Sequence, residues 1–161
     1  MTKEEVYAVL TDKGYEFESV DHVPVFTMEE MEREIHRDLS DVAKNVFLRD
    51  EKKKHWYLVV VQKDKNLDMA KLKDKIGSTR LSFAREDYLM ERLGVERGAV
   101  TPLAILNDPD HVVEVILDED MARRERIAIH PCDNTATVWM KVRDLETLIR
   151  ENGNSLKKIS L

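Results

Sequence analysis

Apolar residues recur every three or four positions in five stretches of the chain, which predicts five short helices. Capping boxes formed by Thr2 with Glu5 and by Thr27 with Glu30 mark the first two helix starts, because each pair satisfies backbone N–H groups that a first helical turn leaves free. Glycine follows directly after most of these stretches and favours helix termination there. The predicted helices cover residues 2–13, 27–35, 69–76, 85–93 and 144–150.

Shorter apolar runs, several of them alternating with polar residues, predict strands. They cover residues 15–23, 45–48, 56–61, 101–106, 112–117, 126–129 and 136–140. The basic run at residues 49–54 is predicted to be an exposed hairpin loop, and the tail from residue 154 is either frayed or docked. Strands in hairpin-like spacing, with helices mostly at the ends and in the middle, favour an α+β fold with a mixed, largely antiparallel sheet.

Length and composition predict one domain spanning residues 1–161, because no linker, repeat or low-complexity segment divides the chain. The single cysteine, Cys132, excludes an internal disulfide and favours a reducing compartment. The N-terminus has no apolar signal core, and no apolar run approaches about 18 residues. We therefore expect a cytoplasmic protein without a membrane partner.

Charge is distributed unevenly although the whole chain carries a net charge of −6. Residues 44–92 hold 13 Lys and Arg against 8 Asp and Glu, a net of +5, while residues 1–43 and 93–161 carry net charges of −8 and −3. A basic middle segment between acidic ends is able to dock a phosphate backbone. Charge alone leaves equally open that these lysines form an ordinary solvated surface.

The familiar signatures of metal, nucleophile and nucleotide sites are absent. The five histidines include no i, i+4 pair, there is no CxxC, and no G-x-S-x-G or glycine-rich phosphate loop occurs. Cys132 lies two residues after His130, but a lone cysteine in a strand-rich region is more often a small apolar filler than a nucleophile. We expect no metal and no cofactor.

Three weaker signals remain. Gly98–Pro102 is a G-x-x-x-P turn, in which glycine permits positive φ and proline holds the preceding Thr101 extended. Lys44 stands at a predicted strand start, and His130 is followed by a polar loop that contains Asn134. Each of these features is also compatible with a purely structural role, as a connector, a solvated lysine or a self-satisfied turn.

Five segments occur together and in a recognisable order. They are residues 44–50 (KNVFLRD), 80–84 (RLSFA), 93–95 (LGV), 98–104 (GAVTPLA), and 130–131 (HP) with 134–137 (NTAT). In this combination the chain resembles the YbaK/ProX-type aminoacyl-tRNA deacylases, a family also seen as the editing insertion of bacterial prolyl-tRNA synthetases. The resemblance spans roughly residues 6–153 and is greatest with the freestanding branch.

The resemblance implies a curved, mostly antiparallel central sheet with flanking helices and a metal-free trans-editing hydrolase that removes alanine from tRNA for proline. It implies that Lys44 engages the terminal adenosine and its phosphate, with Asn45 beside it. The loop from Gly98 through Thr101 to Pro102 would position the ester carbonyl and the attacking water, and His130 would line the amino-acid pocket. Cys132 departs from the aliphatic residue expected there.

The substrate and partners are also expectations. Arg80 is expected nearest the acceptor stem, with phosphate contacts from Lys71, Lys73 and Lys75 and a further substrate contact from Asn134. The partners implied are aminoacylated tRNA for proline and prolyl-tRNA synthetase, with the protein a monomer or weak homodimer. Two alternatives stay open: the same reaction on another mischarged amino acid, such as cysteine or serine, or a non-catalytic regulator that binds proline or aminoacyl-tRNA.

Overall fold

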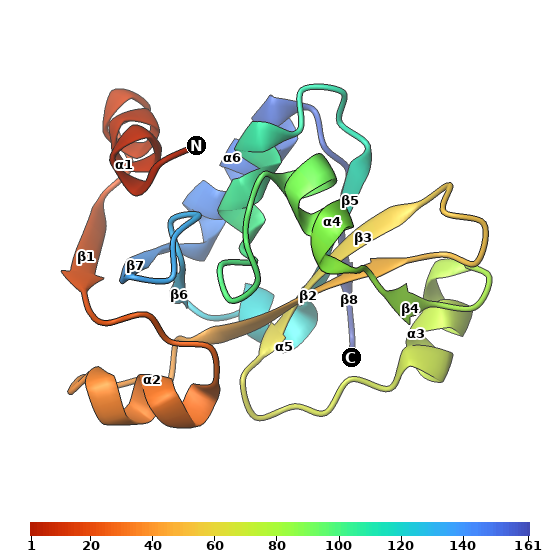
Figure 1. Cartoon of the computed structure of the whole chain (residues 1–161), viewed down its shortest axis with the longest axis horizontal. Helices are drawn as coiled ribbons and strands as arrows, with labels where there is room; N and C mark the ends of the chain where they lie inside the picture. Colours follow the sequence, from red (N-terminus) through yellow and green to blue (C-terminus); the bar gives the residue numbers. More distant parts are fainter.

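The computed structural model describes all 161 residues and places the strands in two hydrogen-bonded groups (Figure 1). The smaller group has the order β1-β7-β6 and the larger the order β4-β2-β3-β5-β8. The strands are β1 (Phe17–Asp21), β2 (Ala43–Arg49), β3 (Trp56–Gln62), β4 (Ser82–Phe83), β5 (Val113–Asp118), β6 (Arg126–Ile129), β7 (Ala136–Lys141) and β8 (Leu156–Ile159).

Helices flank both groups. They are α1 (Lys3–Asp12), α2 (Met28–Glu34), α3 (Met69–Ile76), α4 (Glu86–Tyr88), the π-helix η1 (Leu89–Leu93), the 3-10 helix η2 (Pro102–Asn107), α5 (Glu119–Ala122) and α6 (Val142–Asn152). None of these helices is long and apolar enough to span a bilayer.

Most strand pairs are antiparallel, which confirms the α+β class. Only β5 pairs in parallel, with β3 on one side and β8 on the other. The two groups meet at a single parallel bridge between Val42 and Ala128, supported by the hydrogen bond from Ala128 N to Asp41 O at 2.8 Å. Because Asp41 and Val42 directly precede β2, this bridge places the first residues of β2 between the two sheets.

The predicted helix starts are confirmed in detail at α1 and nearly so at α2. Thr2 and Glu5 form the full capping box of α1. At α2, Thr27 Oγ1 accepts from Glu30 N, but the Glu30 carboxylate accepts from Phe26 N at 3.1 Å, one residue before the expected partner. That contact fixes the short segment that leads into α2.

The strand predicted at residues 101–106 is wrong. Thr101 caps η2 by accepting a hydrogen bond from Leu103 N, and Pro102 occupies its first turn. Proline just inside a capped start is a helix signal, and apolar residues buried on every side carry no period that separates a helix from a strand.

The C-terminal tail, for which both a frayed and a docked state are compatible with the sequence, is docked, because β8 pairs with the edge of β5.

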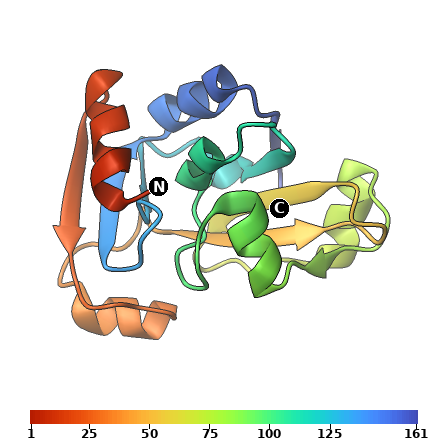
Figure 2. The same cartoon turned by 45° about the horizontal axis from the view of Figure 1, so that its top comes forward.

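One large apolar cluster takes side chains from both sheets and from α1, η2 and α6. Strand β3 is buried along nearly its whole length, which explains its uninterrupted apolar sequence. Figures 1 and 2 show that α2 lies at one end of the molecule, while α3 and β4 lie at the other. The start of β2 faces α2, and its far end pairs with β4 through Leu48 and Arg49.

Candidate functional site

A cavity of about 350 Å³ lies beside the first residues of β2. Its walls come from the segment before α2, from α2 itself, from the loop after η1 and from the end of β6. Four residues singled out from the sequence line it together: Lys44, Asn45, Gly98 and His130. The fold therefore gathers into one place residues that are far apart in the chain.

Lys44 reaches across the hairpin to the connection between β3 and α3. Its Nζ donates a hydrogen bond of 2.6 Å to the backbone oxygen of Lys65. An ammonium group has three N–H donors, so two remain available to a ligand in the cavity.

Asn45 contributes an unsatisfied acceptor. Its Oδ1 is buried and accepts no hydrogen bond from any group of the protein. A buried acceptor without a partner costs about 1–3 kcal/mol of stability. Because Asn45 also lines the cavity, its amide group is a candidate contact for a ligand.

His130 is oriented by the backbone of the neighbouring strand. Its Nδ1 lies 2.8 Å from the backbone oxygen of Ala136, which can only accept, so Nδ1 carries the proton. Burial lowers the pKa of His130, against the raising effect of the Ala136 hydrogen bond, and His22 lowers it further. The ring is therefore neutral near pH 7 and offers Nε2 as an acceptor.

Gly98 brings the loop after η1 close to the segment before α2. Its φ is +89°, and a Cβ at this position would lie 2.7 Å from Phe26 Cδ1 and 3.2 Å from Asn134 Nδ2. Asn134 in turn holds the backbone of Val25, donating to its oxygen at 3.3 Å and accepting from its N–H at 3.4 Å. Asn134 thus supports the cavity wall and does not itself line the cavity.

The apolar wall of the cavity is made mostly by residues without a predicted role in the site. Its members are Val25, Phe26, Met28, Met31, Ala43 and, from the predicted loop, Val100. The one available signal was Phe26, a large apolar residue between a proline and a helix cap. Its exposed fraction of 57% marks it as unusual for an aromatic residue.

Thr101 and Pro102 do not line the cavity. Both are buried, and the Thr101 hydroxyl is used in capping η2. Their part in the G-x-x-x-P turn is to anchor the loop to η2, which leaves Gly98 and Val100 to form the wall.

The predicted tRNA contacts lie at the other end of the molecule from α2 (Figures 1 and 2). Arg80 precedes β4, which pairs with Arg49 at the end of β2. Arg49 is five residue steps from Lys44, roughly 17 Å at ~3.3 Å per residue. Arg80 and Lys71 are exposed, and Lys73 lies 3.8 Å from Asp74. Lys75 donates to the backbone oxygen of Ser160 and so holds the C-terminal strand segment.

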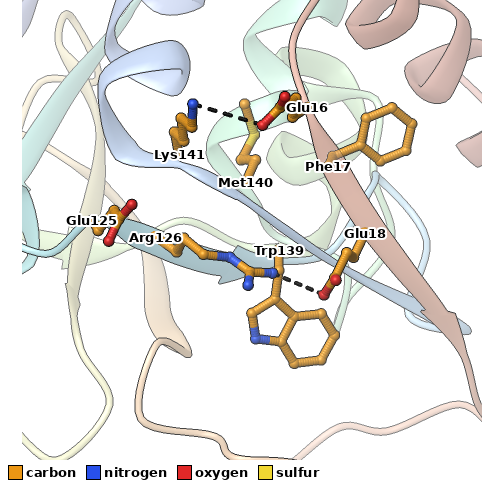
Figure 3. Close-up of a pocket in the computed structure, with 8 residues that line it drawn as sticks. All are labelled: Glu16, Phe17, Glu18, Glu125, Arg126, Trp139, Met140 and Lys141. Atoms are coloured by element: carbon orange, nitrogen blue, oxygen red, sulfur yellow. Dashed lines mark hydrogen bonds and ion pairs between the residues drawn. The ribbon is translucent and has the colours of Figure 1, made fainter.

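A separate cavity of about 260 Å³ lies on the small sheet, away from all the predicted site residues (Figure 3). Its two cations are paired: Arg126 contacts Glu18 at 3.0 Å, and Lys141 contacts Glu16 at 3.7 Å, while Glu125 has no ion-pair partner. With both cations already paired, this cavity offers no free cation to hold a phosphate of the substrate.

A family model described as an aminoacyl-tRNA editing domain matches residues 22–148. The match spans well over half of the chain and includes all four predicted residues that line the cavity. The chain belongs to this editing-domain family. The predicted enzyme class, an aminoacyl-tRNA deacylase, is thereby confirmed.

Relatives of the editing domain extend over nearly the full chain. The prolyl-tRNA editing protein ProX of Acetoanaerobium sticklandii is 44% identical, covering 99% of this chain and 97% of its own. The prolyl-tRNA synthetase associated domain-containing protein 1 of Danio rerio is 34% identical, covering 92% of this chain and 82% of its own.

Solved structures share the fold. A candidate trans-editing enzyme for prolyl tRNA synthetase superposes with a TM-score of 0.72 at 20% identity, covering 99% of this chain and 96% of its own. The hypothetical protein APE2540 gives a TM-score of 0.75 at 20% identity, covering 99% of this chain and all of its own.

Cys132, the expected departure within the family pattern, lies outside the candidate site. It adopts a positive φ of 63°, and burial raises the pKa of its thiol to about 11. It lines a different hollow, together with Lys3 and Met90. The volume of the cavity beside Lys44 is therefore independent of the Cys132 side chain.

The structure contains no group of three or more His, Cys, Asp or Glu side chains arranged to hold a metal.

Proposed function

We propose that this editing domain acts in trans on tRNA for proline and hydrolyses the ester that joins it to mischarged alanine. The observation that carries the proposal is the convergence of Lys44, Asn45, Gly98 and His130 on one cavity. The name of the 44% identical ProX relative supports the choice of tRNA.

The reaction requires few catalytic groups from the protein. An aminoacyl ester is already activated, so its hydrolysis depends on positioning and charge stabilisation more than on a strong nucleophile. The Lys44 ammonium holds the phosphate of the terminal adenosine, and the loop from Gly98 to Val100 positions the ester carbonyl and the attacking water. His130 Nε2 and Asn45 Oδ1 accept hydrogen bonds from donors of the substrate. A ribose hydroxyl assists the proton transfers.

The amino-acid preference follows from the apolar wall. A site that activates proline cannot strongly reject a smaller residue, because each missing methylene costs only about 1–3 kcal/mol. A second pocket too small for proline removes the resulting error. Val25, Met28, Met31 and Val100 line the same cavity as His130, and this apolar wall suits the methyl side chain of alanine.

The tRNA body is proposed to lie along the basic segment. Arg80, Lys71, Lys73 and Lys75 are the candidate contacts beyond the terminal nucleotide, and Lys75 also donates to the backbone oxygen of Ser160. Prolyl-tRNA synthetase, which makes the mischarged product, is the proposed partner. The cytoplasm, where tRNA is charged, is the proposed location.

The test is deacylation measured across tRNA for proline charged with alanine, proline, cysteine and serine. We expect rapid release of alanine and sparing of proline. Equal turnover of alanine and proline would contradict the editing assignment. Preferred release of cysteine or serine would assign the enzyme to that mischarged amino acid in place of alanine. Binding of charged tRNA without any turnover would favour a non-catalytic regulator.

A further inference from the structure

Lys65 has no role in the sequence pattern, yet its backbone oxygen accepts the hydrogen bond from Lys44 Nζ. It lies in the connection between β3 and α3, where its own N–H donates to Gln62 O at 3.0 Å. Connecting segments are usually more mobile than the elements they join. A carbonyl that positions a catalytic cation therefore needs a loop that is held in place.

The side chain of Lys65 provides that restraint. Its Nζ lies 3.0 Å from both carboxylate oxygens of Asp118 and 2.5 Å from Asp120 Oδ2. It also donates to the backbone oxygen of Leu161 at 3.0 Å. The ammonium thus joins the loop to the end of β5, the start of α5 and the segment after β8.

Asp118 makes this restraint strong. It is fully buried, and a buried carboxylate is stable only when it is paired and hydrogen-bonded. Burial lowers the pKa of Lys65, but the hydrogen bonds to Asp120 and Asp118 outweigh burial and raise the pKa above its usual value. Lys65 is consequently charged at neutral pH, and the loop cannot leave without separating its ammonium from the buried Asp118 carboxylate.

We infer that Lys65 is a positioning residue for Lys44: its clamped ammonium fixes the loop whose carbonyl aims the Lys44 ammonium at the substrate. The inference rests on the proposed function, in which Lys44 holds the terminal phosphate. A free lysine samples many rotamers, whereas a lysine held by a fixed acceptor meets the substrate already oriented.

The clamp also has an ordinary structural reading, in which it only closes the end of the sheet. Replacing Lys65 alone does not separate the two readings, because it leaves Asp118 buried without a counter-ion. The double variant Lys65→Met/Asp118→Asn removes both charges and keeps an acceptor for the N–H of Asp120. We expect this variant to retain the fold and to lose the ion pairs of residue 65.

The experiment measures kcat and KM under single- and multiple-turnover conditions on alanine-charged tRNA for proline, with melting temperature as the check on folding. We expect kcat of the double variant to fall at least about tenfold, since misplacement of a catalytic group by 1 Å costs up to about a hundredfold, while KM changes little. The conservative single variant Lys65→Arg, which keeps a cation opposite Asp118, should keep most of the wild-type kcat. Lys63→Met, in the same connection and outside the clamp, is the matched control and should be as active as the wild type.

A mutant cycle with Lys44→Met identifies the route of the effect. If Lys65 acts through Lys44, adding Lys65→Met/Asp118→Asn to Lys44→Met should produce almost no further loss. Losses that multiply would overturn the inference, as would a well-folded double variant with wild-type kcat. A wild-type protein that hydrolyses no mischarged tRNA would overturn the proposed function and the inference together. The inference alone would be overturned if the wild type is active and Lys44→Met is defective, but Lys65→Met/Asp118→Asn is as active as the wild type.

Discussion

Gly98 and Phe26 approach so closely that a Cβ on the glycine would lie 2.7 Å from the phenylalanine ring. The contact joins the loop after η1 to the segment before α2, and both residues line the candidate cavity. Any side chain at position 98 must therefore displace Phe26 and also adopt a φ of +89°.

Gly98→Ala is expected to lower kcat much more than it lowers stability. Left-handed backbone costs an alanine about 1 kcal/mol or more, a moderate loss for the whole fold, but movement of the loop and of Phe26 changes the wall of the cavity. Deacylation kinetics and thermal unfolding measure the two effects separately.

Gly14→Ala is the matched control, because Gly14 also has positive φ, +75°, and has no atom within 4 Å of the added Cβ. It should lose similar stability and no activity. Equal loss of activity in both variants would show that Gly98 serves only the backbone. The combination Gly98→Ala/Phe26→Ala, which relieves the contact but not the backbone strain, should recover part of kcat.

The pH dependence of the enzyme should report the neutral state of His130. Burial lowers the pKa of this ring from its usual value of 6.5, with His22 also lowering it while Ala136 and Asp133 raise it. A depressed histidine pKa gives stability that is fully present above pH about 6.5 and is lost as pH falls through the folded-state pKa. Activity should decline over the same range, because protonation removes the Nε2 acceptor.

His130→Gln should abolish this acidic limb in both kcat and the free energy of unfolding. The exposed His36 offers a control, and His36→Gln should leave both pH profiles unchanged. An acidic limb that persists in the His130 variant would show that another group is responsible for it.

The sequence indicated much of this site and missed the contacts that assemble it. Lys44, Asn45, Gly98 and His130 stand in recognisable local segments, so a resemblance was enough to select them. The wall formed by Val25 and Phe26 is brought to Gly98 only by folding. The clamp at Lys65 acts through a backbone oxygen, which every residue type possesses, so it leaves no signature in the sequence.

The error at residues 101–106 has an equally specific cause. The stretch from Pro102 to Ile105 is buried on all sides, so its hydrophobicity has no period that separates a helix from a strand. Counting charges identifies residues 44–92 as the basic segment, but it cannot show that Lys75 also donates to the backbone oxygen of Ser160.

Charge reversal on α3 should test the proposed path of the tRNA. Lys71→Glu and Lys73→Glu are each expected to weaken binding of charged tRNA and to reduce the salt dependence by about one phosphate contact. Hydrolysis of aminoacyl-adenosine, which lacks the acceptor stem, should be unchanged. Lys157→Glu, at an exposed position on β8, controls for overall charge. If Lys157→Glu weakens binding as much as the α3 variants, the effect is one of net charge and the path lies elsewhere.

Asn45→Leu should raise the free energy of unfolding and lower the deacylation activity. The buried Oδ1 has no partner in the protein, so an apolar side chain of similar size removes an unsatisfied acceptor and should raise the free energy of unfolding by about 1 kcal/mol. The same change removes an acceptor from the substrate, and kcat/KM should fall at least about tenfold, the equivalent of about 1.4 kcal/mol. Chemical denaturation and deacylation kinetics on one preparation would give both values. Tyr7→Phe is a comparison outside the cavity, since the Tyr7 hydroxyl is also buried and has Ser19 as its neighbouring polar side chain. It should keep full activity. An Asn45→Leu protein that is no more stable than the wild type but still loses activity would mean that Oδ1 is satisfied in solution. One that gains stability and keeps its activity would show that the cavity beside Lys44 does not bind the substrate through Asn45.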